Sequence, residues 1–215
     1  YSYVAVKTES GVGLAYNFPN TWGLDCCLDI TNIKGLRGKS VKDFIYKGDL
    51  LLNSIALATL NSVLKNGELD KSQLYEKFDF KDKTVAMVGD FKPLAGNIKG
   101  LAKRLDIFEL KDIPGTVKPN FGKIYLREAD FLIVTGAAFV NLTVEDYLNF
   151  TPEDCKIIFT GPTAPLSNLL SEVGYIAGAR VKDDEKSLEA VKKGGGMHSL
   201  KGLLSKIWIE RKVPV

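Results

Sequence analysis

The sequence predicts an α/β fold, in which a Rossmann-like domain with a parallel sheet follows a small α+β domain. Three observations support this prediction. Residues 1–16 alternate large apolar residues with small or polar ones, which is typical of a β-hairpin. Residues 50–64 are almost all apolar or small, as in a buried helix. From residue 84 onward, short apolar runs alternate with helical segments, the pattern of βαβ units.

The first half is expected to form strands and then helices. Tyr1–Thr8 and Val12–Tyr16 should pair across a turn at residues 9–11, and a third strand is expected at Leu24–Ile30. A short helix is expected at Val41–Tyr46.

A longer helix should begin after Asp49, its N-cap, and end near Asn66-Gly67. Because this helix is apolar nearly all round, it is expected to be buried. Asn53 and Asn61 then need hydrogen-bond partners, since burying an unpaired amide costs about 1–3 kcal/mol.

The second half is expected to form a parallel sheet with right-handed crossovers. Its strands are predicted at Thr84–Val88, Asp106–Glu109, Phe131–Thr135, Lys156–Thr160 and Tyr175–Ala179. Its helices are predicted at about residues 94–104, 144–149, 166–171 and 185–192, with a last amphipathic segment at 200–209. A charged stretch precedes the sheet, so we expect a capping domain at residues 1–70, a connector at 71–83 and a ligand-binding domain at 84–215.

Composition excludes several classes of partner. The net charge of +3 is too small, and the lysines too dispersed among acids, for a nucleic-acid-binding surface. No apolar run approaches the roughly 18–20 residues of a membrane span, and no signal segment is seen, so a cytoplasmic location without a membrane partner is expected.

The chain starts at Tyr1 rather than Met, so we expect residues before it. Small two-domain proteins of this kind often form symmetric homodimers.

Cysteine and histidine give weak metal signals. The cysteines are Cys26, Cys27 and Cys155, an odd number with two adjacent, which is no disulfide framework. The vicinal pair is either a soft-metal site or two small buried residues, and we favour the second because free cysteine is among the most buried residue types. His198 follows three glycines, so a lid motion could bring it to a site, but a surface histidine is the favoured interpretation.

Ligands of open α/β sheets bind outside the carboxyl ends of the strands, and the loops there hold the candidate site residues. Gly89, Asp90 and Phe91 follow the first strand and open a helix, where N–H groups can hold an anion. This loop lacks the other glycines of a dinucleotide fingerprint and is equally well an ordinary turn. Glu109 ends the next strand, where an acid often accepts hydrogen bonds from ribose hydroxyls; the alternative is a surface glutamate.

Two later loops complete the expected site. Thr135 and Gly136 end a buried strand and let a ligand approach the backbone, and Asn141 offers both donors and acceptors. Gly161-Pro162-Thr163 begins a rigid loop in which one proline could be cis.

We expect the turns beginning at Gly89, Thr135 and Gly161 to meet over a single crevice, roofed by the N-terminal helix. Asp90 and Glu109 are the acid–base candidates. Replacing the second acid, Glu109→Gln, is expected to weaken a ribose-bearing ligand while folding stays nearly intact.

Taken in order, these loops resemble those of the putative heavy-metal chelation family, a group of unknown function. The matching stretches are MVGDFKPL (87–94), the strand ending in Glu109, EADFLIVTGAAFVNLTVEDYL (128–148), IIFTGPTAPLSNLL (157–170) and VGYIAGARVKD (173–183), with GVGLAY (11–16) and NSIALATLNSVL (53–64) in the first half. The family pairs a TG…VN-x-T segment with a GP-(S/T)-x-P-L segment about twenty residues later, and both are present here. Many relatives have a small residue where this chain has Leu142.

The resemblance implies a domain similar to the capping domain of enolases, a Rossmann-like domain, and a site in the crevice between them. Carried over residue by residue, that site comprises Asn61, Gly89, Asp90, Phe91, Glu109, Thr135, Gly136, Asn141, Gly161, Pro162 and Thr163.

Three functions follow as hypotheses. The first is a small-molecule-binding protein with an interdomain site that handles a heavy-metal chelate or its precursor. The second is a transferase-type enzyme using an adenosine-containing cofactor such as S-adenosylmethionine or a nucleotide. The third is a non-catalytic carrier. The expected ligand is accordingly a divalent heavy metal or an adenosine-containing compound, which a thermal-shift screen would distinguish.

Overall fold

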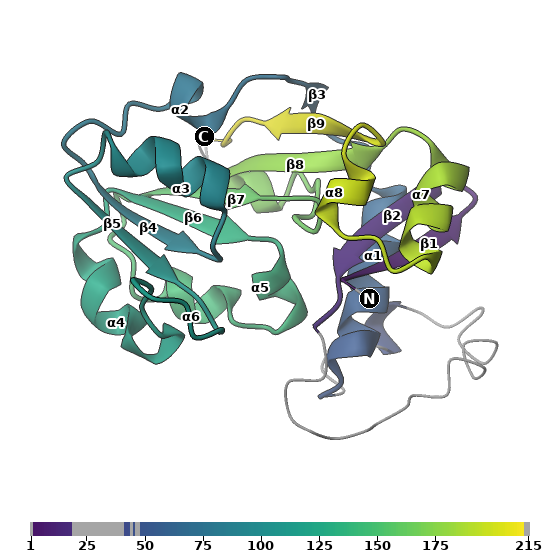
Figure 1. Cartoon of the computed structure of the whole chain (residues 1–215), viewed down its shortest axis with the longest axis horizontal. Helices are drawn as coiled ribbons and strands as arrows, with labels where there is room; N and C mark the ends of the chain where they lie inside the picture. The colour runs from purple at the N-terminus through teal and green to yellow at the C-terminus, as the bar shows by residue number, and fades with distance from the viewer. Residues whose placement is uncertain (1, 19–40, 44, 46–47, 213–215) are drawn as a thin grey trace.

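A seven-stranded sheet and a separate hairpin organise the computed structural model, which describes residues 2–18, 41–43, 45 and 48–212 (Figure 1). The large sheet has the order β3-β9-β8-β7-β6-β4-β5. Its five parallel strands are β4 (Thr84–Val88), β5 (Arg104–Phe108), β6 (Phe131–Thr135), β7 (Lys156–Thr160) and β8 (Tyr175–Val181). The predicted parallel sheet is therefore confirmed, with three strands at the expected bounds, β5 beginning earlier at Arg104 and β8 extending further to Val181.

The strand order reverses direction at β4. The chain runs from β4 outward to β5, then returns past β4 to build β6, β7 and β8 on the other side. In order of sequence the parallel strands lie 2-1-3-4-5, the arrangement of a doubly wound sheet. In such sheets the carboxyl ends of the two strands at the reversal, here β4 and β6, border the crevice where ligands bind.

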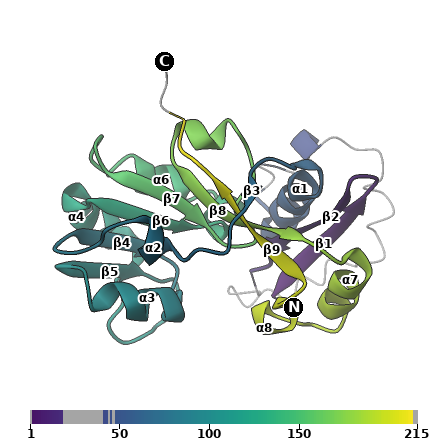
Figure 2. The same cartoon turned by 90° about the horizontal axis from the view of Figure 1, so that it is seen from above.

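Helices cover both faces of the sheet (Figure 2). Val85 and Met87 face α2 (Leu74–Lys77) and α3 (Lys92–Lys99), whereas Ala86 and Val88 face α4 (Gly122–Tyr125) and α6 (Val144–Leu148). Because successive side chains of a strand point to opposite faces, a sheet covered on both sides needs apolar residues at every position. This requirement explains the continuous apolar runs of β4 and β6.

The N-terminal hairpin forms as expected. β1 (Tyr3–Thr8) pairs antiparallel with β2 (Gly11–Tyr16). Gly13 brings β2 into contact with α1 (Leu50–Val63), since a Cβ at that position would lie 2.0 Å from the Ala58 carbonyl oxygen. The expected third strand at residues 24–30 lies outside the described residues, and the short helix predicted from residue 41 is described only as a 3₁₀ turn, Val41–Asp43.

α1 is capped as the sequence predicts. The Asp49 carboxylate accepts hydrogen bonds from the N–H groups of Leu51 and Leu52 at 2.8 and 3.1 Å. The helix ends at Val63, three residues before the expected stop, because Leu64 is extended. Neither α1 nor any other helix of the described part combines the length and apolarity that a bilayer crossing needs.

The two amides of α1 have partners for their donors, whereas the Oδ1 atoms of Asn53 and Asn61 are buried with no hydrogen-bond partner among the described residues. Asn53 Nδ2 donates to the Val140 carbonyl at 2.9 Å. Asn61 Nδ2 donates to Leu14 at 2.9 Å and to Thr163 at 3.2 Å. These bonds join α1 both to the hairpin and to loops of the large sheet.

Four segments differ from expectation. Residues 166–169 are not helical, and a 3₁₀ turn follows at Leu170–Glu172; the Leu166 carbonyl accepts a hydrogen bond from Asn66 Nδ2 at 2.9 Å. Residues 204–209 form β9 (Leu204–Ile209), an antiparallel neighbour of β8. β3 (Glu68–Leu69) pairs with β9, so the chain joins the large sheet before residue 70. The helix expected at residues 94–104 is α3, which ends at Lys99 because β5 begins at Arg104.

Candidate functional site

A cavity of about 260 Å³ lies at the carboxyl ends of β4, β5 and β6, where the strand order reverses. We call it the main cavity. Aromatic side chains form much of its wall: Tyr3, Tyr16, Phe18, Phe91, Phe108 and Tyr147. Its polar residues include Asp90, Glu109, Lys111, Thr135 and Asn141. The hairpin and the sheet therefore enclose one space between them.

The three expected turns lie together at this edge. Gly89 has φ +93°, a conformation that favours glycine, and a Cβ there would lie 3.3 Å from Cβ of Thr135. Gly161 has φ +95°, and a Cβ there would lie 3.9 Å from the Phe91 ring. The turns that begin at Gly89 and Gly161 thus both lie beside the Phe91 ring, and Thr135 lies against Gly89.

Glu109 supports the loop after β4. Its Oε2 accepts a hydrogen bond from the Asp90 N–H at 3.2 Å, and its Oε1 accepts one from the Lys111 N–H at 3.1 Å. Both carboxylate oxygens therefore hold backbone groups. The Asp90 carboxylate also lines the cavity, yet no described residue bonds to it.

Asn141 is oriented by its neighbour. Its Oδ1 accepts from the Thr143 hydroxyl at 2.8 Å and from the Thr143 N–H at 3.3 Å. No described residue accepts from its Nδ2. Asn141 lines the main cavity, and its two amide donors are available to a ligand there.

Tyrosines at the cavity keep their protons. Burial, followed by the charge interaction with Tyr16, raises the pKa of Tyr3 to about 12. The pKa of Tyr147 is also raised to about 12, first by burial and then by the negative charges of Asp146 and Glu109. At neutral pH both hydroxyls are hydrogen-bond donors.

The structure divides the expected site residues into two groups. The residues that line the main cavity are Gly89, Asp90, Phe91, Glu109, Thr135 and Asn141. The residues that do not line it are Asn61, Gly136, Gly161, Pro162 and Thr163.

In the second group, Asn61 and Thr163 join the hairpin and α1 to the sheet. Thr163, 3% exposed, accepts the Tyr16 N–H on its Oγ1 at 2.9 Å. A Cβ on Gly136 would lie 2.1 Å from the Ala164 nitrogen, so Gly136 permits close packing of two loops. The cavity is bordered by hairpin residues and by none of α1, contrary to the expected roof.

Several lining residues went unrecognised in the sequence. Tyr3 and Tyr16 are register partners in the hairpin, with ring centroids 6.1 Å apart, so the predicted pairing already contained that signal. Phe18, Lys111 and Tyr147 carried no comparable pattern. Their positions depend on how the hairpin and the loops dock.

A metal site built by the protein alone is not seen in the described part of the chain, where no group of three or more His, Cys, Asp or Glu residues is placed to hold an ion. His198 is exposed in α8 (Met197–Leu200) and does not line the main cavity. Burial raises the pKa of Cys155 to about 12. Cys26 and Cys27 lie outside the described residues.

No described peptide bond is cis, so the bonds that precede Pro162 and Pro165 are both trans.

Solved structures of similar fold are known. A protein of unknown function from the DUF364 family of Desulfitobacterium hafniense has a TM-score of 0.82 at 23% identity, covering 97% of this chain and 87% of its own. Another from the DUF364 family of Pyrococcus horikoshii has a TM-score of 0.79 at 20% identity, covering 97% and 88%. At these identities the likeness shows the fold. No curated protein matches the chain.

Two family models match the sequence, and both carry the description "Putative heavy-metal chelation". DUF4213 matches residues 1–64, which include the hairpin and α1. DUF364 matches residues 76–209, which include the parallel sheet, and this stretch is more than half of the chain. The chain therefore belongs to the DUF364 family, "Putative heavy-metal chelation".

Proposed function

We propose that the protein binds a planar organic chelator, free or carrying a divalent heavy metal, in the main cavity. The observation that carries this proposal is the combination of aromatic walls and acidic side chains with the lack of a three-residue metal cluster in the described part of the chain. A cavity of this kind suits a ligand that brings most of its own metal donors. The family description is consistent with that reading.

The aromatic walls favour a flat ligand. Phe91 extends from the loop after β4, while Tyr16 and Phe18 extend from the hairpin, with the latter two ring centroids 5.0 Å apart. Aromatic faces and edges bind planar rings by burial and by offset or edge-on contacts, worth about 0.5–1.5 kcal/mol each beyond burial. Rings on two separate structural elements can close on a planar molecule from different sides.

The polar groups suit a metal complex. Asp90 offers a carboxylate that no described residue engages, and Asn141 offers amide donors. A carboxylate can balance the positive charge of a complex or supply one further metal ligand. Lys111, at the same cavity, can neutralise an acid on a free chelator.

Calorimetric titration tests the proposal with four probes: Ni²⁺ alone, 2,2′-bipyridine, their one-to-one complex, and S-adenosylmethionine. We expect bipyridine and its nickel complex to bind and Ni²⁺ alone to bind far more weakly. Phe91→Ala should weaken the binding of bipyridine and of its nickel complex about tenfold, because it removes an aromatic wall. Phe121→Ala is the matched control, since Phe121 is 48% exposed and lines no part of the cavity. Equal affinity for Ni²⁺ alone and for its complex would contradict the proposal.

A transferase using an adenosine-containing cofactor is the second candidate. Glu109 directly follows β5 beside the Gly89 turn, the place where an acid often binds ribose in doubly wound sheets. Its two oxygens already hold the N–H groups of Asp90 and Lys111, although each oxygen has a further lone pair. Binding of S-adenosylmethionine without binding of bipyridine would favour this candidate. A ligand that binds and is recovered unchanged would favour the carrier.

A further inference from the structure

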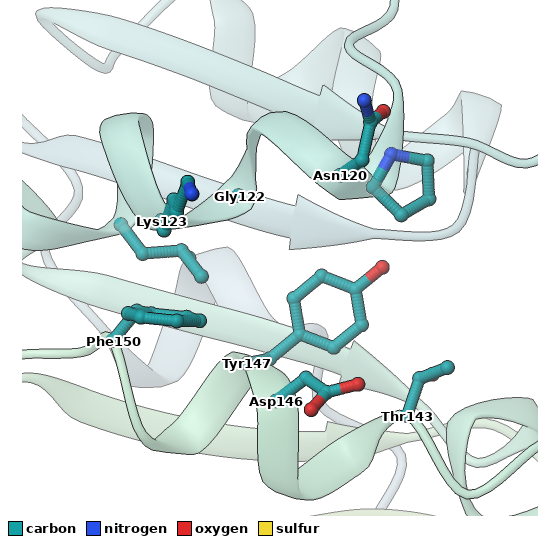
Figure 3. Close-up of a pocket in the computed structure, with 9 residues that line it drawn as sticks. Asn120, Gly122, Lys123, Thr143, Asp146, Tyr147 and Phe150 are labelled. Carbon is teal, nitrogen blue, oxygen red and sulfur yellow. The ribbon is translucent and has the colours of Figure 1, made fainter.

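A second cavity of about 260 Å³ adjoins the main cavity, and we call it the side cavity. It lies between α4 and α6 and is drawn in Figure 3. Pro119, Thr143 and Tyr147 line both cavities. A molecule in the main cavity therefore meets the side cavity at these three residues.

Tyr147 stands at the junction as a donor without an acceptor. Its side chain is 5% exposed and packs against Phe108, with ring centroids 5.9 Å apart. No described residue hydrogen-bonds its hydroxyl. The hydroxyl oxygen is not fully buried. Figure 3 shows the hydroxyl directed away from Phe150. A ligand with an acceptor at the junction would satisfy this hydroxyl.

The walls of the side cavity are mainly apolar. Leu126, Phe150 and the Tyr147 ring supply hydrocarbon surface. The charged residues Lys123 and Asp146 also line it, but both are exposed and their charges have opposite sign. The surroundings thus favour an uncharged apolar group over an anion or a cation.

We infer that the ligand of the main cavity carries a short hydrocarbon arm, which passes Tyr147 into the side cavity while the Tyr147 hydroxyl donates a hydrogen bond to the planar part. This inference rests on the proposed function and narrows the ligand to an amphiphilic chelator. Tyr147 then acts as a specificity-determining residue between the two compartments.

Calorimetry with 2,2′-bipyridine and 4-propyl-2,2′-bipyridine tests the arm. We expect the propyl compound to bind wild-type protein about tenfold more tightly, because its methylenes leave water. Phe150→Ala should reduce that gain below about threefold by removing a wall of the side cavity. Phe121→Ala should leave the gain unchanged, since Phe121 is similarly exposed but lines neither cavity.

The Tyr147 hydroxyl is tested with a matched pair of tyrosines. Tyr147→Phe keeps the ring and should weaken the binding of 2,2′-bipyridine and of its propyl derivative about fivefold. Tyr125→Phe should weaken neither, although Tyr125 packs on the same Phe108 ring at 6.3 Å, because it lines neither cavity.

The outcomes separate this inference from the proposed function. If neither compound binds wild-type protein, the proposed function fails and the inference with it. If bipyridine binds but the propyl arm adds less than about twofold, or if the gain survives Phe150→Ala, the inference is wrong and the proposed function stands. Tighter binding of an arm ending in a carboxylate or an amine would contradict the apolar assignment.

Discussion

The Glu109 carboxylate accepts the Asp90 N–H at 3.2 Å and so connects the end of β5 to the loop after β4. Its other oxygen accepts the Lys111 N–H at 3.1 Å. Two acids that look alike in the sequence therefore have different roles. Glu109 shapes the cavity, and Asp90 faces it with a carboxylate that no described residue engages.

Glu109→Gln should lower the free energy of unfolding by about 1 kcal/mol. In the variant, the amide NH₂ would face one of the two backbone N–H groups that the Glu109 carboxylate accepts in the wild-type protein. This expectation replaces the one made from sequence, in which folding stays nearly intact. Asp90→Asn should change stability by less than about 0.5 kcal/mol, since the Asp90 carboxylate bonds no described residue. Urea unfolding of both variants measures the difference. Equal losses in the two would contradict the assigned roles.

Thr163→Val tests the connection between hairpin and sheet. The variant leaves the Tyr16 N–H without its acceptor at a position where Thr163 is 3% exposed, so we expect a loss of about 1–3 kcal/mol. Thr59→Val is the matched control, because the Thr59 hydroxyl donates to the Ile55 carbonyl within α1 and bonds no other described residue. Urea midpoints that fall equally in both variants would argue against a special role for the Tyr16–Thr163 bond.

Local sequence signals predicted much of the fold. β4, β6 and β7 have the predicted bounds because each is a short apolar run buried between layers. The start of α1 followed from Asp49, a local cap. The helix expected at residues 166–171 did not form, and there the Leu166 carbonyl accepts a hydrogen bond from Asn66, a hundred residues away in sequence. Contacts of that kind have no local signal.

Leu142→Gly should keep or raise stability. Leu142 has φ +60°, a conformation that costs a non-glycine residue roughly 1 kcal/mol. A glycine there avoids this cost but gives up a similar amount of stability, because its unfolded chain has more conformational freedom to lose. Leu142→Val should be less stable than both, because β-branching makes this conformation worse. Thermal unfolding of the three proteins gives the order. A glycine variant less stable than the valine variant would refute the strain argument.

Alkaline pH should destabilise the protein partly through its buried tyrosines. Tyr3 and Tyr147 have folded pKa values of about 12 against an ordinary value of 10.0. Between pH 10 and 12 the unfolded chain therefore binds fewer protons than the folded one, and stability falls as pH rises. The double variant Tyr3→Phe, Tyr147→Phe should show a shallower fall in urea unfolding measured from pH 9 to 11.5. An unchanged slope would mean that these two groups do not contribute.

The candidate site was only partly predictable for a related reason. Gly89, Thr135 and Glu109 stand at strand ends, so the rule for open sheets located them. Tyr16 reaches the same cavity through a bond to Thr163, 147 residues later, and no local pattern encodes that docking. The sequence therefore indicated the sheet side of the cavity and left out its hairpin side.

The central claim is that a chelator occupies the main cavity between the hairpin and the carboxyl ends of β4, β5 and β6. The most direct measurement is a crystal structure of the protein with the nickel complex of 2,2′-bipyridine, with the metal located by anomalous scattering at the nickel edge. We predict one strong nickel peak beside Asp90, with the bipyridine rings between Phe91 and Tyr16. A nickel peak elsewhere, or nickel bound by protein side chains with no bipyridine density, would contradict the account.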